Sequence, residues 1–344
     1  MPNDSLGLVG LTIDGKYRVE EVVAETHLSV VYRAVHRVWR RPVAIKAFKA
    51  GHVAESQRAG LLAAFIREGA ILTELSERCA AICQARDVSS IMSEDGHWVP
   101  YLVLEWLDGE TLDAMLVRER EGGARPRTVA EAICLLEPVS RALALAHDRD
   151  VVHRDVKPGN IVVLASGCKL LDFGIASMLH SALAASSGSG SGNGRAGAAA
   201  ADVEQDPSFT PAYGAPEQFL PELGPTGPWT DEYALALVFV ELVTGLEPLG
   251  SGDIGESSTR SCDPARRPTP ATLGKPIDPV VERTLGRALS LLPSERFGHV
   301  GEFWSALKSV APSRWADASH TIPIPLRRPR SSRSWRRLFG GAST

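Results

Sequence analysis

The chain has 344 residues, of which 44% are hydrophobic and 23% charged, and its formal net charge is −4. These values are typical of a globular protein with one large or two medium domains, and they argue against a chain that is disordered throughout. No run of 18 or more apolar residues occurs and the N-terminus lacks the pattern of a secretory signal, so we expect no transmembrane segment and a cytoplasmic protein.

The N-terminal third has the pattern of a sheet with one helix. Residues 11–50 are strand-rich and end in RPVAIKAF. Residues 55–77 have apolar side chains at helical spacing, which predicts a helix with one buried stripe that includes Ile66. Residues 81–105 predict two more strands, joined by the turn SEDGH.

The rest of the chain is predicted to be mainly helical. Its clearest helical stretches are 128–147, 231–245 and 278–290. The sequence therefore predicts an α+β protein with two lobes, a β-rich N-lobe with one helix over residues 11–105 and a helical C-lobe over 108–312. The chain is expected to cross between the lobes near residues 105–108.

Three segments are expected to lie outside these lobes. Residues 1–10 form a short N-terminal arm in this interpretation. Residues 181–201 are rich in Gly, Ser and Ala and can bury almost nothing, which predicts a flexible insert over 181–206. Residues 313–344 contain prolines, serines and six arginines between Arg327 and Arg337, which is typical of a disordered basic tail.

The densest group of chemically useful side chains lies in VVHRDVKPGNIVV, residues 151–163. Apolar runs that look like strands flank a polar loop with Asp155, Lys157 and Asn160. The carboxylate can accept a proton, the ammonium can neutralise a phosphoryl oxygen, and the amide oxygen can bind Mg²⁺, which prefers oxygen ligands. Asp172 follows the next apolar run and supplies a second oxygen ligand for the same ion.

These motifs together resemble the eukaryotic-type protein kinase family. The sequences VAIK (43–46), HRDVKPGN (153–160), DFG (172–174) and APE (215–217) stand in the family's order, and the match covers residues 11–312. The sequence KPGN is similar to the serine/threonine branch, and GKYRVEEVV is most similar to its bacterial members.

The resemblance implies roles for the polar residues. Lys46 would hold the α- and β-phosphates of ATP, with Glu68 as its ion-pair partner, although Glu68 could also be a solvated helix charge. Asp155 would orient the substrate hydroxyl and accept its proton, and Lys157 would contact the γ-phosphate. The two ligands of Mg²⁺ would be Asn160 and Asp172.

Further residues follow from the same resemblance. Glu105 and Leu107 would offer backbone groups to adenine at the hinge. Thr210 would support the catalytic loop, and Asp231 would brace it, unless Asp231 is only a charge at a helix N-terminus. The remaining positions implied by the family are two ion-pair residues, Glu217 and Arg296, and three apolar residues at the nucleotide, Val23, Val31 and Ala44.

The family's glycine-rich loop, GxGxxGxV, is degenerate in this chain. Its glycines are replaced by Ala24, Thr26 and Ser29. Glycine lets a backbone approach phosphate closely and adopt unusual torsions, and the β-branched Thr26 is the stiffest replacement. The backbone N–H groups that contact phosphate are still present, so the loop is expected to be weakened rather than lost.

Three functions therefore remain open at this point. The first is an active serine/threonine kinase with a weak ATP clamp, which is favoured because the four charged or metal-binding residues are all retained. The second is a pseudokinase that binds nucleotide or acts as a scaffold. The third is a small-molecule phosphotransferase of the same fold, which the APE sequence and Thr210 disfavour because they are features of peptide kinases.

Partners and regulation are the least determined by the sequence. The implied partners are protein substrates with serine or threonine, and autophosphorylation is possible at serines of the long segment 172–217, Ser208 above all, with Arg154 as the phosphate's partner. The basic tail could contact an anionic surface or act as a pseudosubstrate, or it could simply be solvated.

Overall fold

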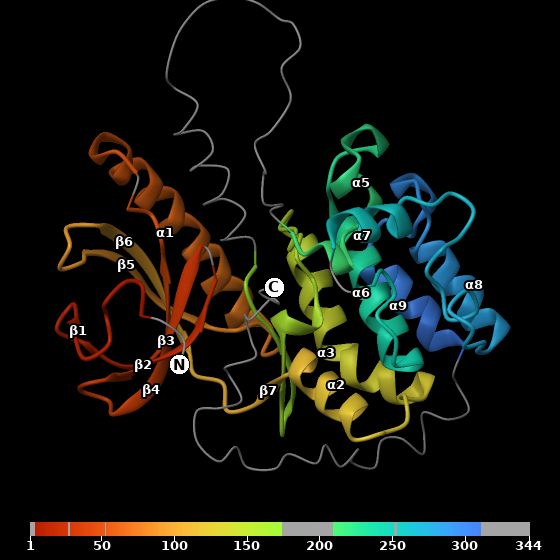
Figure 1. Cartoon of the computed structure of the whole chain (residues 1–344), viewed down its shortest axis with the longest axis horizontal. Coiled ribbons are helices and arrows are strands. Elements are labelled where there is room, and N and C mark those ends of the chain that lie inside the picture. The colour runs from red at the N-terminus through yellow and green to blue at the C-terminus, as the bar shows by residue number, and fades with distance from the viewer. Residues whose placement is uncertain (1–3, 27, 52, 174–208, 251–252, 311–344) are drawn as a thin grey trace, which may run out of the picture.

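The computed structural model describes residues 4–26, 28–51, 53–173, 209–250 and 253–310. These residues form two lobes side by side, a sheet with one helix and a larger helical part (Figure 1). The predicted α+β architecture is confirmed, and the chain passes between the lobes directly after Glu105, as expected. Among the described helices, none is both long and apolar enough to cross a membrane.

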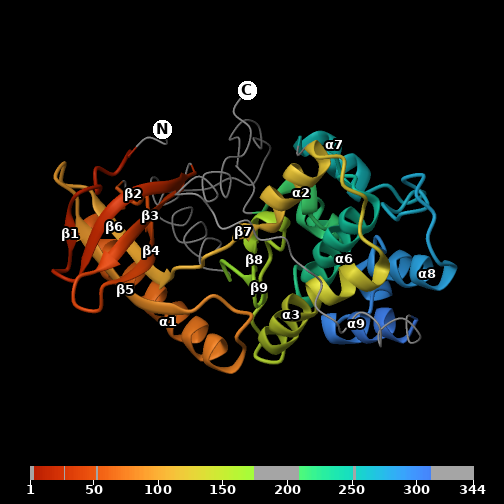
Figure 2. The same ribbon diagram turned by 90° about the horizontal axis from the view of Figure 1, so that it is seen from below.

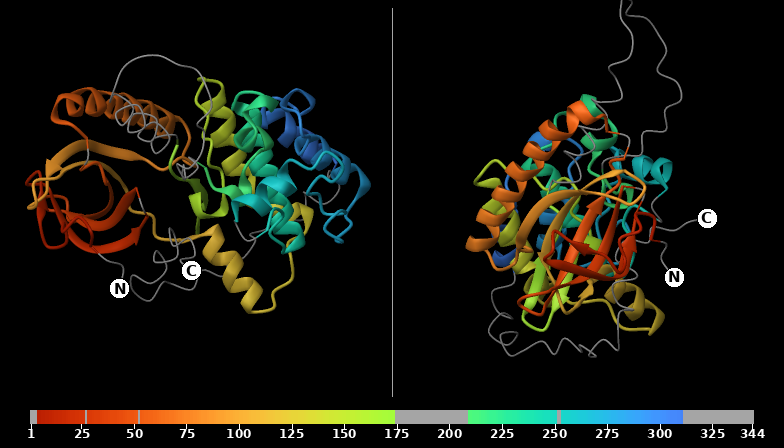
Figure 3. Two further views of the ribbon diagram at one scale, coloured as in Figure 1. Left: turned by 45° about the horizontal axis from the view of Figure 1, so that its top comes forward. Right: turned by 90° about the vertical axis from the view of Figure 1, so that its left-hand side faces the viewer.

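The N-lobe is a six-stranded sheet in the order β1-β2-β3-β4-β6-β5, and its strand pairs are antiparallel. Its strands are β1 (Thr12–Ile13), β2 (Tyr17–Glu25), β3 (Ser29–His36), β4 (Arg41–Phe48), β5 (Ala85–Met92) and β6 (Trp98–Glu105). Helix α1 (Glu55–Arg78) covers one face of this sheet (Figure 3). Valine is the most frequent residue at the buried positions of the strands, followed by alanine and tyrosine, and β-branched and aromatic side chains favour pleated positions.

Helix α1 agrees with the predicted range but not with its full apolar stripe. Phe65, Leu72 and Leu75 are buried against the sheet, whereas Ile66 is 46% exposed. The buried face of the helix follows Phe65, Gly69, Leu72 and Leu75, which lie three or four residues apart along the chain. Ile66 therefore lies on the flank of this face rather than within it.

Residues 4–10 pack against the N-lobe instead of extending from it as an arm. Leu8 is completely buried on the sheet face opposite α1. The Tyr32 hydroxyl donates to Asp4 Oδ1 at 2.6 Å, and the N–H of Gly10 donates to the carbonyl of Val19 at 3.0 Å. These contacts close the outer face of the sheet, so the packed lobe begins before residue 11.

The C-lobe combines helices with a small sheet that the sequence did not predict as such. Its helices are α2 (Leu112–Glu121), α3 (Val129–His147), α5 (Pro216–Phe219), α6 (Pro228–Thr244), α7 (Ile254–Ser261), α8 (Pro279–Ala288) and α9 (Val300–Ser309). The small sheet has the order β7-β8-β9, with β7 at Glu110–Thr111, β8 at Ile161–Leu164 and β9 at Gly167–Leu170. Short 3₁₀ turns cover Pro158–Asn160, Pro211–Tyr213, Pro221–Leu223 and Pro293–Glu295. The expected strand before His153 is not formed, because residues 151 and 152 lie in a loop.

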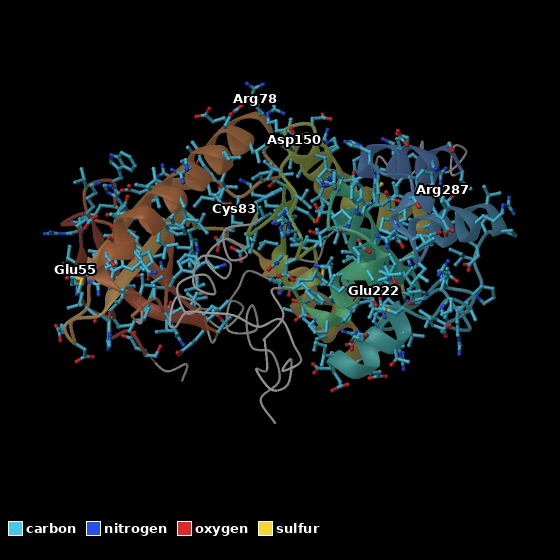
Figure 4. The ribbon with its side chains drawn as sticks, turned by 90° about the horizontal axis from the view of Figure 1, so that it is seen from above. Glu55, Arg78, Cys83, Asp150, Glu222 and Arg287 are labelled. Atoms are coloured by element: carbon cyan, nitrogen blue, oxygen red, sulfur yellow. The ribbon has the colours of Figure 1, made fainter. Side chains whose placement is uncertain are left out.

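The small sheet lies between the lobes and joins them (Figure 2). The N–H of Cys83, in the segment after α1, donates to the carbonyl of Leu170 at 3.0 Å, and the N–H of Leu170 donates to the carbonyl of Ala81 at 2.7 Å. The end of α1 at Arg78 lies close to Asp150, beyond α3, and Cys83 lies nearer the middle of the molecule (Figure 4). This junction holds β9 against the segment that follows α1.

Candidate active site

Asp231 of α6 binds the backbone of the polar loop that follows α3. This carboxylate is almost fully buried and accepts hydrogen bonds from the N–H groups of His153 at 2.8 Å and Arg154 at 2.7 Å. It also bonds His147 Nε2, at the end of α3, at 2.8 Å. His147 was not predicted as a site residue, since its only sequence signal is a histidine at the end of an apolar helix. Asp231 thus braces the loop and is not merely a charge at a helix end.

Asp155 lies at the centre of a hydrogen-bonded cluster. Its Oδ1 accepts from the N–H of Thr210 at 3.0 Å, and its Oδ2 accepts from Asn160 Nδ2 at 3.1 Å and lies 2.8 Å from Lys157 Nζ. Lys157 also donates to the Thr210 hydroxyl. The structure therefore brings these four predicted residues together.

The protonation state of Asp155 follows from these contacts. Burial by itself raises the pKa of a carboxyl group, but the charge of Lys157 and the hydrogen bonds from Lys157 and Thr210 outweigh it, and the pKa of Asp155 is lowered. Asp155 is consequently a carboxylate at neutral pH, able to accept a hydrogen bond from a hydroxyl.

Asp172 is placed next to Asn160 by the pairing of β8 and β9. Ile161 is the partner of Leu170 in this pairing, and beyond it the N–H of Leu171 donates to the carbonyl of Asn160 at 2.8 Å. Asp172 itself has a φ of +57°, a backbone conformation that is uncommon outside glycine and is often found at functional sites. Phe173 is buried with its ring centroid 4.9 Å from that of His153.

Lys46 of β4 reaches this cluster from the N-lobe. Its ammonium forms an ion pair with Asp172 at 2.8 Å, and both side chains are largely buried. The structure thus gathers an ammonium from the sheet lobe and the carboxylate and amide groups of the helical lobe at one junction, as the sequence motifs predict.

The expected ion pair between Lys46 and Glu68 is not formed in this structure. Glu68 Oε2 is a buried atom without a hydrogen-bond partner among the described residues. Burial raises the pKa of Glu68 to about 7, and the positive charge of Arg154 only partly opposes this shift. The ionic partner of Lys46 among the described residues is Asp172.

The apolar residues assigned to the nucleotide belong to one buried cluster. Val23, Val31 and Ala44 are at most 5% exposed and belong to the same cluster as Leu107. They lie on the face of the sheet opposite the cluster that contains Leu8.

Glu105 is fixed by its side chain as well as by its strand. Its Oε1 accepts a hydrogen bond from the N–H of Gln84 at 2.9 Å and pairs with Lys169 of β9, and its own N–H donates to the carbonyl of Gln84 at 2.9 Å. From the sequence, only backbone groups of Glu105 are expected to bind a ligand. The side chain ties the hinge to both neighbouring segments.

The glycine-free loop is a closed hairpin turn between β2 and β3. The hydroxyl oxygen of Thr26 accepts hydrogen bonds from the N–H groups of Ser29 at 3.0 Å and Leu28 at 3.3 Å. These two backbone N–H groups, which are present as the sequence analysis expects, already have an acceptor in this structure. Their acceptor is supplied within the loop itself.

A fully buried ion pair anchors the segment beyond Thr210. Arg296 binds both carboxylate oxygens of Glu217, at 2.9 and 2.8 Å, and both side chains are 0% exposed. The Thr230 hydroxyl donates to Glu217 Oε1 at 2.7 Å. The predicted pairing of Glu217 with Arg296 is confirmed.

A second cluster in this region was not predicted. The Tyr213 hydroxyl donates to Glu241 Oε2 at 2.5 Å, and Arg120 of α2 lies 3.1 Å from the other oxygen of Glu241.

The insert 181–206, Ser208 and the tail 313–344 lie outside the described residues.

Comparison with known proteins agrees with this geometry. The family model described as "Protein kinase domain" matches residues 17–290. The chain is 30% identical to the serine/threonine-protein kinase PknA of Mycobacterium tuberculosis, over 92% of this chain and 66% of the relative, and 29% identical to PknL of Mycobacterium bovis, over 91% and 70%. The chain thus spans about two thirds of the length of these curated relatives.

Solved structures show the same fold. The kinase domain of Mycobacterium tuberculosis PknI has a TM-score of 0.58 at 24% identity and covers 88% of this chain and 98% of its own. A structure described as the apo form of PpkA-294 has a TM-score of 0.62 at 23% identity, with coverage of 87% and 98%.

Proposed function

Since this chain belongs to the protein kinase family, in its bacterial serine/threonine branch, we propose that it transfers the γ-phosphoryl group of ATP to serine and threonine hydroxyls of protein substrates. The observation that carries this proposal is the meeting of Lys46 with Asp172 beside the Asp155 cluster. A structural loop would not need an ammonium from one lobe and a carboxylate from the other in a shared, largely buried pair. Phosphoryl transfer needs both, because it proceeds mainly by positioning and charge neutralisation.

The residues fit ATP and a divalent cation. Asn160 directs its amide nitrogen to the carbonyl oxygen and carboxylate of Asp155, which leaves its amide oxygen as the atom to meet a metal ion. Together with the carboxylate of Asp172 it supplies the hard oxygen ligands that Mg²⁺ prefers. Bound Mg²⁺ would neutralise the phosphate oxygens. In that state Lys46 would exchange Asp172 for the α- and β-phosphates.

Asp155 and its neighbours would handle the substrate hydroxyl. Asp155 is held as a carboxylate, so it can orient the hydroxyl and accept its proton as the oxygen attacks phosphorus. Lys157 lies between Asp155 and Thr210, where its charge would stabilise the transferred phosphoryl group. Thr210 holds both Asp155 and Lys157, and it therefore couples the segment that precedes APE to the catalytic loop.

Glu68 Oε2 has no hydrogen-bond partner among the described residues, and a catalytically active arrangement would supply one. In that arrangement α1 would lie closer to β4, so that Glu68 pairs with Lys46 when Asp172 turns to the metal ion. Pairing would also remove the cost of a buried carboxyl group without a partner. We propose Glu68 for this role on the basis of its position in α1, three residues beyond the buried Phe65.

The remaining parts of the proposal concern regulation and partners. Autophosphorylation on the segment before Thr210, with Arg154 as phosphate partner, is supported by the family and by the place of Arg154 directly before Asp155 in the sequence. Residues 11–312 are proposed as the kinase domain, in a cytoplasmic protein. The arginines of residues 313–344 are proposed to contact anionic surfaces.

Transfer of labelled phosphate tests this function. The protein is incubated with Mg²⁺, γ-labelled ATP and a generic basic protein, alongside its Asp155→Asn variant, which keeps the size of the side chain but cannot accept the proton. We expect labelled serine and threonine with the unaltered chain and at least a hundredfold less with the variant, a typical loss for a positioned general base. Equal labelling by both proteins would refute the role of Asp155. Binding of ATP without any transfer would favour the pseudokinase.

A further inference from the structure

The loop between β2 and β3 achieves its turn without glycine. None of its described residues, Ala24 to Thr26 and Leu28 to Ser29, has a positive φ. The N–H of Thr26 donates to the carbonyl of Ser29 at 2.8 Å, which closes the hairpin across its tip. The described residues of the loop therefore have ordinary torsions, and the β-branch of Thr26 is compatible with them.

The Thr26 hydroxyl is the internal acceptor of this turn. Its oxygen accepts hydrogen bonds from the N–H groups of Ser29 and Leu28, at 3.0 and 3.3 Å. The hydroxyl itself donates to the carbonyl of Ser29 at 3.3 Å. Threonine and serine form such local bonds two and three residues onward, and these bonds compete with other acceptors for the same N–H groups. In a loop with glycine at this position, no side-chain oxygen is present to compete.

Lys49 holds Thr26 in this arrangement. Its ammonium donates to the carbonyl of Thr26 and to Glu25 Oε1, both at 2.7 Å. Its backbone N–H donates to the carbonyl of Leu28 at 2.8 Å. The loop is therefore tied to the end of β4 on both sides of its tip, and Thr26 is fixed where its oxygen meets the two N–H groups.

We propose that Thr26 sets the nucleotide affinity of this protein by occupying, with its own hydroxyl oxygen, the loop amides that would otherwise bind ATP phosphate. This inference rests on the proposed function, since it assumes that phosphates lie beneath the β2–β3 loop. Thr26 acts as an internal substitute for a phosphate oxygen. A phosphate must displace it to reach the N–H groups of Leu28 and Ser29, and the gain from those contacts is reduced accordingly.

Three substitutions separate the hydroxyl from the other properties of threonine. Thr26→Val keeps the volume and the β-branch but removes the acceptor oxygen. Thr26→Ser keeps the oxygen and removes the β-branch, and Thr26→Gly removes both. Dissociation constants for ADP, a non-hydrolysable ATP analogue and adenosine are measured with Mg²⁺ for the full chain and each variant, by calorimetry or by displacement of a fluorescent nucleotide.

We expect T26V and T26G to bind ADP and the ATP analogue about tenfold more tightly than the unaltered chain, the size of one regained hydrogen bond to a charged group. T26S should bind like the unaltered chain, since it keeps the oxygen. Adenosine has no phosphate, so its affinity should change by less than about twofold, whereas a general effect on the fold of the loop would change all three ligands.

The outcomes distinguish this inference from the function on which it rests. ADP affinity that is unchanged or weaker in T26V, or a gain that adenosine shares equally, would overturn the role of Thr26 while leaving the kinase activity proposed. Absence of nucleotide binding by all four proteins would overturn both.

Discussion

The buried pair of Arg296 and Glu217 is expected to be the most sensitive ionic contact in the C-lobe. The guanidinium makes two hydrogen bonds to the carboxylate and three to the carbonyl oxygens of Trp229, Ser290 and Leu291, at 3.0, 2.9 and 3.2 Å. Substituting methionine for Arg296 keeps an unbranched apolar stem and removes all five bonds. The carboxylate of Glu217 is then left buried, with the Thr230 hydroxyl as its remaining described partner.

The expected loss of stability follows from this count. Removing one partner of a buried ion pair costs about 3–5 kcal/mol, mainly because the other charge stays in a medium that solvates it poorly. At about 2–4 °C per kcal/mol for a domain of this size class, the melting temperature should fall by roughly 6–20 °C. The double variant E217Q/R296M should recover part of this loss, since it leaves no buried charge.

Thermal and urea unfolding followed by circular dichroism measure the effect. The matched control is Arg78→Met, because Arg78 pairs with Glu74 at 3.4 Å on the surface of α1, where both side chains are more than half exposed. The control should cost less than about 0.5 kcal/mol. If R296M costs less than about 1 kcal/mol, or no more than R78M, the argument from burial is refuted.

Three further predictions concern the catalytic loop and α1. Asp231→Asn should lower kcat at least roughly tenfold in a steady-state assay, because one amide oxygen cannot replace two carboxylate oxygens that accept three hydrogen bonds. A change within about twofold would show that Asp231 is only a charge at a helix N-terminus. Thr210→Val should lower kcat roughly tenfold by removing the hydrogen bond to Lys157, while Thr210→Ser should keep most of the activity. An equal loss of kcat in both variants would contradict a role for the hydroxyl. Burial raises the pKa of Glu68 from 4.5 to about 7, so the folded chain holds the extra proton and its stability falls as the pH rises from about 4.5 to about 7. The free energy of unfolding of Glu68→Gln minus that of the unaltered chain should therefore be larger at about pH 8 than at about pH 5 in urea unfolding. A difference that does not change with pH would show that Glu68 does not titrate in this range.

The sequence contained enough local information to predict most elements. Helix 55–77 is observed as Glu55–Arg78, and the apolar stretch 128–147 is observed as Val129–His147, because long amphipathic segments encode their own period. The prediction of a strand before His153 is wrong, because a two-residue apolar run has no periodicity that distinguishes a strand from a buried loop. The packing of residues 4–10 is not predictable from the local sequence, because their burial depends on a distant sheet face.

The identities of the residues at the site were determined by the sequence, since the order and spacing of VAIK, HRD, DFG and APE already assign a charge or a metal ligand to each position. Which partner each of these groups takes was decided only by the tertiary structure. Lys46 could meet Glu68 or Asp172, and the choice depends on where α1 packs relative to β4. The N–H groups of Leu28 and Ser29 could face a phosphate or the oxygen of Thr26, and the choice depends on how Lys49 holds the turn. A hydrogen bond or ion pair forms only over a few ångströms and in a narrow range of directions, and the packing of separate elements sets both.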